Sequence, residues 1–482
     1  MLPVLNVLGR LLVVFSLTYV APILCSALFH DGMHWHFVDG MAISAAGGLL
    51  LYLATRRHYR ELKPRDGFLL VTLSWVLMAA IAAVPLMLAY DKMSFTDAFF
   101  ECISGLTTTG ATVMTGLDYA PQSINLWRHL MNWIGGMGII VFAVAILPLL
   151  GVGGMQLFKA ETPGPMKDSK LTARITDTAK ALYLVYVGMT VLCVLSLRLA
   201  GMDWFDSVCH AFSAMGLGGF STRDASIGAF DSPAVEIVLS FFMLLAGINF
   251  ATHFLALRRL SIGPYRHDAE ARAYLTIMGL CFIGLTFYLY HKGVYDRPET
   301  SARMVLFNLI SIGTGSGYAS TDFAQWPIFA PLLMLFLGGT IPCAGSTGGG
   351  IKMVRTLVLF GQSQREILKL IHPAAIRPLM IGRTAVSERV AQSVLGFIFL
   401  YFMSAALMIF LLLLSGMDFL TAFSAIIACI NNIGPGLGDV GPAGNYQALS
   451  DFQTWVCAFA MLLGRLEIFA VLIIFTPGFW RK

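Results

Sequence analysis

Four glycine-rich segments of the chain combine residue types that could bind a dehydrated cation. Glycine lets the backbone turn its carbonyl groups toward a shared axis, because it adopts φ and ψ values that other residues rarely adopt. A ring of carbonyl oxygens can replace the hydration shell of a monovalent cation. The segments are GLTTTGAT (105–112), SAMGLGGFST (213–222), SIGTGSGYAST (311–321) and CINNIGPGLG (429–438). Together they predict a cation selectivity filter.

The segments superimpose without gaps on one key glycine each, namely Gly110, Gly219, Gly317 and Gly434. The residues expected to bind the ion are each key glycine and the two residues before it. They are Thr108, Thr109 and Gly110; Leu217, Gly218 and Gly219; Gly315, Ser316 and Gly317; and Asn432, Ile433 and Gly434.

The same superposition predicts a short helix before each segment. Sixteen residues before the key glycines stand four preferred helix N-caps, Ser94, Asp203, Ser301 and Asp418. A helix of about eleven residues is about 16 Å long, roughly half the thickness of the bilayer core. Irregular backbone at that depth is tolerated where it lines a water-filled cavity. Four such units around one axis would aim the negative C-terminal ends of their helices at a common point.

The alternative is that the four segments are glycine- and threonine-rich linkers on the outside of a helical bundle. That interpretation explains neither the four caps nor their constant distance from the key glycines.

Composition supplies the elements that position the segments. The chain has 482 residues, of which 57% are hydrophobic and 12% charged, which is typical of a polytopic membrane protein. Apolar runs long enough to span a bilayer as helices occur ten times. They lie near 2–28, 39–55, 68–90, 124–150, 180–200, 233–257, 273–291, 326–360, 390–415 and 453–476.

The predicted fold is therefore an all-α polytopic membrane protein. It has two N-terminal spans and then four span–pore-helix–span repeats around a pseudo-fourfold pore. The expected boundaries are 1–66 for the two-span domain and 67–158, 159–262, 263–372 and 373–482 for the repeats.

Charge placement predicts the orientation. Most of the 32 Lys and Arg residues lie in alternate links, around 56–65, 159–180, 258–272 and 352–389 and at the C-terminus, whereas the opposite links are acidic. By the positive-inside rule, both termini are cytoplasmic. The basic links are interpreted as orientation signals and not as a nucleic-acid interface. The eight cysteines form no CxxC pair, and we expect neither disulfides nor a metal site from them.

A second unusual stretch is TIPCAGSTGGGIK (340–352), which interrupts the apolar run 326–360. Pro342 and the following glycines should break the helix into two halves joined by a loop inside the membrane. We expect the loop to lie under the filter and to act as a gate; the alternative is a kink that serves packing. The expected gating residues are Gly345, Ser346, Thr347, Gly348, Gly349 and Gly350, with Lys352 either a latch on the gate or an inner-surface charge.

Several arginines stand within predicted spans, among them Arg465, Arg128 and Arg198. Arg465 lies inside the last span, where a charged side chain normally faces protein or water. It is expected either to pair with helix-end carbonyls or to project below the filter as a positive barrier that works with the loop. Arg128 and Arg198 lie near span ends and are expected to snorkel.

These features resemble a known family. Four unlike pore repeats in one chain, each built on a key glycine, occur with the motifs WIGGMGI (133–139), GGFST (218–222), CAGSTGGGIK (343–352) and GRLEIF (464–469). The combination resembles the Trk/Ktr/HKT superfamily of cation transporters, and most closely the membrane subunits of its bacterial Trk branch. The resemblance implies potassium uptake, with K⁺ bound at the filter. In that family a serine at the first key glycine is associated with sodium transport, and here all four are glycine.

The resemblance also implies partners and a location. It implies a homodimer in the bacterial inner (plasma) membrane, surrounded by lipid, with a cytosolic ring of TrkA-like subunits. No cofactor is expected in this chain, and a regulatory nucleotide (NAD, ATP or ADP) is expected on the ring subunit alone.

Two other function classes have sequence signatures of their own. An ion-coupled symporter of potassium with protons or sodium, working by alternating access, remains the alternative, although such folds often use inverted repeats and these four point the same way. An integral-membrane enzyme is not expected, because no HExxH, GxSxG or paired-carboxylate set appears.

Overall fold

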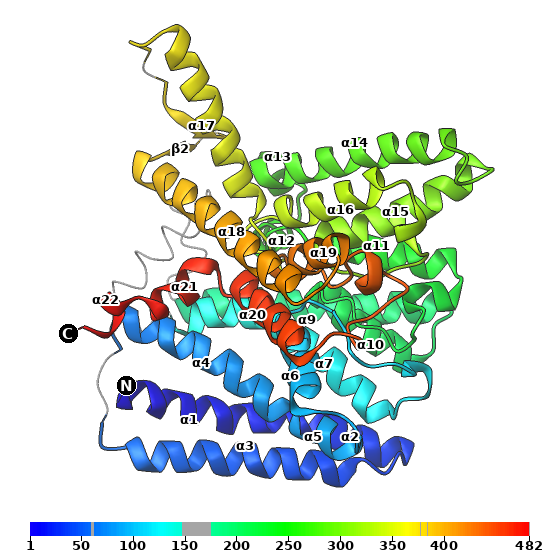
Figure 1. Ribbon diagram of the computed structural model, residues 1–482, viewed down its shortest axis with the longest axis vertical. Helices are drawn as coiled ribbons and strands as arrows, with labels where there is room; N and C mark the ends of the chain where they lie inside the picture. Colours follow the sequence, from blue (N-terminus) through cyan, green and yellow to red (C-terminus); the bar gives the residue numbers. More distant parts are fainter. Residues whose placement is uncertain (59–61, 147–174, 376, 383, 482) are drawn as a thin grey trace.

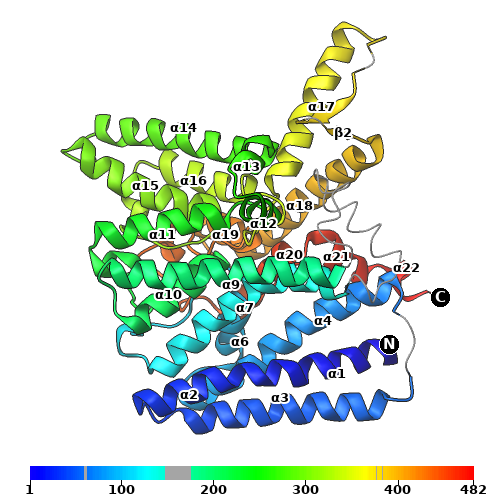
Figure 2. The same cartoon turned by 180° about the vertical axis from the view of Figure 1, so that it is seen from behind.

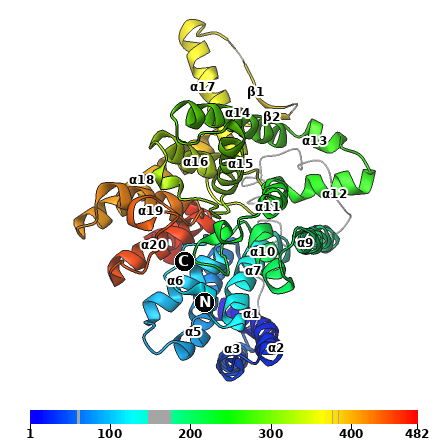
Figure 3. The same ribbon diagram turned by 90° about the vertical axis from the view of Figure 1, so that its right-hand side faces the viewer.

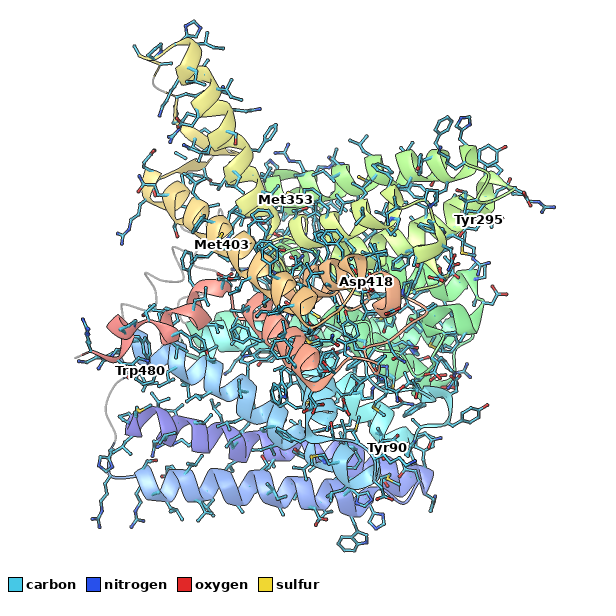
Figure 4. The ribbon with its side chains drawn as sticks, in the orientation of Figure 1. Tyr90, Tyr295, Met353, Met403, Asp418 and Trp480 are labelled. Carbon is cyan, nitrogen blue, oxygen red and sulfur yellow. The ribbon has the colours of Figure 1, made fainter. Side chains whose placement is uncertain are left out.

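The computed structural model describes residues 1–58, 62–146, 175–375, 377–382 and 384–481. The regular secondary structure of the described part is helical apart from two short strands, β1 (Leu379–Ile381) and β2 (Thr384–Val386), which pair antiparallel. The two termini lie at the same end of the molecule (Figure 1). Tyr295 and Trp480 mark the opposite ends (Figure 4).

Six helical stretches in the described residues are long and apolar enough to cross a membrane. The first combines α1 (Leu2–Ser16), a short 3-10 turn and α2 (Val20–Phe29), and the third combines α4 (Pro64–Ala82) with α5 (Val84–Ala89). The others are α3 (His34–Thr55), α9 (Ile175–Leu199), α14 (Ala269–His291) and α18 (Glu388–Leu414). They coincide with six of the predicted spans, and the chain is a multi-pass membrane protein.

Two further predicted spans are bent. The pair α11 (Pro233–Ala246) and α12 (Phe250–Arg259) turns by 97°, and α20 (Asp451–Arg465) turns by 115° into α21 (Ile468–Leu472). The sequence predicted a span at both places but did not predict either bend. Asn249 starts α12 anew, since its side chain accepts the Ala251 N–H at 2.9 Å. At the second bend Glu467 adopts a left-handed conformation with φ 61°.

The remaining two predicted spans contain α7 (Gln122–Ile146) and the broken pair α16 (Phe329–Thr340) and α17 (Met353–Ile371). The predicted break in 326–360 is confirmed, and α17 runs outward beyond the other helices (Figures 1 and 3). The predicted boundary between repeats one and two, at 158/159, lies outside the described residues, as does most of the basic link 159–180.

Four short helices precede the glycine-rich segments, as predicted. They are α6 (Phe95–Leu106), α10 (Trp204–Gly216), α15 (Pro298–Thr314) and α19 (Phe419–Ile430). Ser94, Asp203 and Asp418 are N-caps whose side chains accept the N–H of the third following residue, and Asp418 stands at the outer end of α19 (Figure 4).

The predicted cap Ser301 is wrong. Pro298 takes the first position of α15, which suits a residue without an N–H group, so the helix begins a turn earlier. Ser301 therefore lies inside the helix and donates to the Thr286 carbonyl at 3.0 Å.

Two large apolar cores hold the repeats. One joins α4, α6 and α7 with α18, α19 and α20; the other joins α9, α10 and α11 with α14, α15 and α16. Figure 2 shows α9 and α11 side by side in the second group. The first core thus combines repeats one and four, and the second combines repeats two and three.

Glycines let the long helices approach the ends of the short ones. A Cβ atom at Gly135 of α7 would overlap the Leu106 carbonyl, and one at Gly464 of α20 would overlap the Ile430 carbonyl. Leu106 and Ile430 are the last residues of α6 and α19, each four residues before a key glycine. Close helix contact thus fixes the depth at which these segments start.

We expect Gly464→Ala to destabilise the protein. The added methyl group cannot be accommodated without moving α20 or α19, and overpacking of this kind costs roughly 1–3 kcal/mol. The measurement is the apparent melting temperature in detergent, followed by size-exclusion chromatography. Gly279→Ala is the matched control, because a Cβ atom there meets nothing within 4 Å. Equal melting temperatures for both variants would contradict the close contact.

Candidate ion-binding site

The four glycine-rich segments adopt the same backbone conformation. Each short helix ends in a turn in which the residue before the key glycine donates its N–H to the carbonyl five residues earlier, at 2.8–2.9 Å. The residue two before the key glycine is left-handed in every segment, with φ between 54° and 80°. These residues are Thr108, Leu217, Gly315 and Asn432. The four segments, which were aligned by their spacing alone, therefore also have equivalent backbone geometry.

The key glycines themselves are left-handed, with φ of 79°, 67°, 87° and 95° in chain order. Each lies against the next repeat. A Cβ atom at Gly110 would overlap the Gly218 carbonyl, one at Gly219 the Ser316 carbonyl, and one at Gly317 the Ile433 carbonyl. One at Gly434 would crowd the Thr109 carbonyl, which closes the ring. The residue just before each key glycine supplies the neighbouring carbonyl in all four contacts.

The ring opens into one cavity. All four key glycines line it, together with the residues that follow them and side chains at its outer rim. The rim carries Arg223 and Asp224, and Asp224 accepts the backbone N–H groups of Gly116 and Leu117 at 2.9 and 3.0 Å. Hence the segments that leave the ring in repeats one and two are fastened to each other.

The loop between α16 and α17 lies at the inner ends of the same segments. A Cβ atom at Gly349 would lie 2.5 Å from the Asn431 carbonyl, and one at Gly348 would lie 3.0 Å from the Thr314 carbonyl. Thr347 donates its hydroxyl to the Met215 carbonyl at 3.0 Å. The predicted position of the loop, directly under the glycine ring, is confirmed by these contacts.

The bend between α11 and α12 holds the loop from the side. Cys343 donates its N–H to the Gly247 carbonyl and Phe250 donates its N–H to the Gly345 carbonyl, both at 3.0 Å. Glu270, at the start of α14, accepts the Ala344 N–H at 2.8 Å. The carbonyl that α11 frees by bending is thus used to bind the loop.

A buried arginine and a half-buried lysine also bind the loop. Arg465 donates to the Thr347 carbonyl and to the Gly135 carbonyl, each at 2.8 Å, so it ties the loop to α7. Lys352 donates its ammonium group to the Gly348 carbonyl. The sequence left two alternatives open for each of these residues. Arg465 binds backbone carbonyls, one of them in the loop, and Lys352 binds a carbonyl of the loop. Glu467 instead pairs with Arg355 at 2.7 Å.

The snorkelling prediction holds for Arg198 and fails for Arg128. Arg198 is exposed at the end of α9 and lies over the Trp204 ring. Arg128 is only 2% exposed and forms an ion pair with Glu101 of α6 at 2.7 Å. Sequence reasoning missed this pair, although Glu101 stands nine residues before Gly110 on a helix expected to enter the membrane.

Comparison with known proteins identifies the family to which the chain belongs. Residues 34–482 match the family model described as "TrkH: Cation transport protein". The chain belongs to this family. It is 46% identical over 99% of both chains to the Trk system potassium uptake protein TrkH of Halomonas elongata, and 42% identical, again over 99% of both, to that of Escherichia coli K12.

A solved structure agrees as well. The crystal structure of the potassium transporter TrkH from Vibrio parahaemolyticus superimposes with a TM-score of 0.91 at 42% identity, covering 100% of this chain and 99% of that one. The family resemblance inferred from the motifs is confirmed. The relatives are named as transporters, and so the prediction of a transport protein and not an enzyme is also confirmed.

Proposed function

We propose that the chain is the potassium-uptake subunit of a Trk system and that K⁺ passes through the ring of glycines. The observation that carries this proposal is the closed order of contacts, in which the carbonyl before each key glycine lies against the key glycine of the preceding repeat. The names of the relatives, which are potassium uptake proteins, support the choice of ion.

The chemistry follows from the backbone. A ring of carbonyl dipoles compensates the loss of water from K⁺, and four helix C-termini directed at it add negative partial charge. Among the described residues, no hydrogen bond goes to the carbonyls of Thr109, Gly218, Ser316 or Ile433, so these four carbonyls are available to an ion on the axis. We assign the bound K⁺ to the twelve residues predicted from the sequence.

A gated pore accounts for the contacts better than alternating access does. The ring joins all four repeats in turn, so rocking one half of the protein against the other would break it. The loop beneath the ring is built of small residues and can change its path without moving a large side chain. We propose that residues 345–350, with Lys352 and Arg465, form the gate on the inner side.

The proposal includes partners on the cytoplasmic side. Exposed basic residues at the ends of α12 and α17, among them Arg258, Arg259 and Lys369, would suit the docking of a TrkA-like ring that carries the nucleotide. Exposed apolar side chains of α17, such as Ile367 and Leu370, support a homodimer. We place it in the bacterial inner membrane with both termini in the cytoplasm, as the basic links indicate.

We expect Gly110→Ser to admit sodium. Its Cβ atom would displace the Gly218 carbonyl and loosen the ring, so the potassium-to-sodium flux ratio should fall roughly tenfold, about 1.4 kcal/mol of discrimination. The measurement is flux into proteoliposomes under potassium, rubidium and sodium gradients. Gly116→Ser serves as control, because Gly116 also has a positive φ but a Cβ atom there meets nothing within 4 Å. An unchanged ratio in folded Gly110→Ser would contradict the filter.

Deleting Gly348–Gly350 should raise basal flux and weaken nucleotide control without changing the order of ion preference. Arg465→Ala should act in the same direction, because it frees Thr347 and removes a positive charge below the ring. Arg465→Lys keeps the charge but not the two-pronged contact, which separates the two causes. Arg198→Ala is the matched control at the far end of α9. If the deletion variant shows wild-type flux and wild-type regulation, the loop is not a gate and the packing-kink interpretation is favoured.

Reversal of inner charges tests the partner. Arg365 is unsuitable for this purpose, since it binds Glu388 with two hydrogen bonds at 2.7 and 2.8 Å and joins α17 to α18. Lys369→Glu with Arg377→Glu should instead weaken co-purification of the ring subunit while leaving the potassium-to-sodium ratio unchanged. Lys292→Glu, at the opposite end of α14, is the control. Full capture of the ring by the double variant would place the docking surface elsewhere.

A further inference from the structure

A buried ion pair lies directly behind the glycine ring. The Glu101 carboxylate accepts the Arg128 Nε–H at 2.7 Å, the Val113 N–H at 3.0 Å and the Thr112 hydroxyl at 3.0 Å. Both charged side chains are 1% exposed. Thr112 and Val113 follow Gly110 in the chain, so Glu101 holds the segment by which repeat one leaves the ring.

Arg128 carries this contact into the next repeat. Its Nη1 donates to the Ser221 carbonyl at 3.1 Å, and its guanidinium lies over the Phe220 ring, 4.3 Å from the centroid. Its Nη2 donates to the Thr112 hydroxyl at 3.3 Å. Phe220 and Ser221 follow Gly219 directly. One guanidinium therefore connects the residues that follow two adjacent key glycines.

The position of Glu101 has polar counterparts in other repeats. Nine residues before the second and third key glycines stand His210 and Asn308. His210 Nε2 lies 3.0 Å from the Ser221 hydroxyl, and Asn308 donates to the Ser320 hydroxyl at 2.9 Å. The fourth repeat has Ala425 there, and the neighbouring Ser424 accepts the Leu437 N–H at 2.7 Å instead. Each short helix thus fastens its own exit segment. Repeat two also uses a carboxylate, since Asp206 of α10 accepts the Thr222 hydroxyl at 2.6 Å, but Glu101 is the one whose arginine partner reaches the exit segment of the next repeat.

Burying a charged pair in this place costs free energy of desolvation, so the geometry of the pair has to be good. Removing two charges from water carries a penalty that their attraction offsets only with good geometry and further hydrogen bonds. Here every remaining hydrogen bond of the pair goes to the exit segments or to the adjacent Asn125. Arg128 also lines the outer cavity, where its charge would repel cations if Glu101 did not neutralise it.

We propose that Glu101 and Arg128 are positioning residues that set the width of the glycine ring in repeats one and two, and so contribute to its preference for potassium. This inference rests on the proposed function of the ring as a filter. It assigns selectivity to side chains that do not touch the ion, through the backbone of Thr112, Val113 and Ser221.

The test is ion flux through Arg128→Met and Glu101→Gln, normalised to folded protein. Both changes release the exit segments, so the potassium-to-sodium ratio should fall, by roughly tenfold for the loss of hydrogen bonds to a charged group. The rates should move in opposite directions. Arg128→Met leaves an unpaired negative charge near the mouth and should raise cation flux, whereas Glu101→Gln leaves a positive charge and should lower it. If the pair served stability alone, the potassium-to-sodium ratio would stay at the wild-type value and the flux per folded protein would not change in opposite directions in the two variants.

Two further variants make the result decisive. Arg303→Met breaks an ion pair of similar length, 2.9 Å to Glu236, whose contacts go to α11 and Asp231 and not to the ring; it should leave the ratio unchanged. Arg128→Lys keeps the positive charge but loses the planar set of N–H donors of the guanidinium. It is used in place of Arg128→Met if that variant does not fold.

Gly110→Ser distinguishes failure of the filter from failure of the positioning role. If Gly110→Ser lowers the ratio while folded Arg128→Met, Arg128→Lys and Glu101→Gln all keep the wild-type ratio, the positioning role is overturned and the filter stands. If Gly110→Ser also keeps the wild-type ratio, the filter itself is wrong and the positioning role falls with it.

Discussion

The close approach of each key glycine to a carbonyl of the next repeat is the constraint on which the rest of the structure depends. The contact leaves no room for a side chain, and it requires a left-handed backbone at the same four places. Four short helices must therefore end at matching depth, which the glycines of α7 and α20 permit by admitting the carbonyl ends of α6 and α19. One apolar core joins repeats one and four, the other joins repeats two and three, and the ring of glycines connects all four.

Buried and half-buried cations lie around this ring, and each binds backbone carbonyls or an acid. Arg128 lies behind its outer part with Glu101, while Arg465 and Lys352 bind carbonyls of the loop at its inner end. A charge inside a membrane protein normally faces protein or water and marks a functional region. In this chain the three cations all contact backbone next to the glycine ring or the loop below it, so they lie beside the ion route that we propose.

Much of this arrangement could be predicted from sequence because it repeats. Constant spacing located the key glycines and three of the four caps, and Pro342 with the glycines after it located the break before α17. The rest depends on contacts between distant elements. Ser301 looked like a cap, but Pro298 starts the helix earlier. The bends after α11 and α20 carry no proline and are stabilised by the loop and by Arg355. Arg128 looked like an end-of-span arginine, because its partner Glu101 lies 27 residues away on another helix.

The most direct test of the account is to locate the ion. Crystals grown or soaked in rubidium, which substitutes for potassium and scatters anomalously, should show a peak on the axis of the ring, within coordination distance of the carbonyls of Thr109, Gly218, Ser316 and Ile433. The peak should weaken in Gly110→Ser crystals and when sodium replaces rubidium. A well-ordered ring without an anomalous peak, or a peak bound instead by side chains elsewhere in the membrane region, would contradict the claim that these carbonyls select the ion.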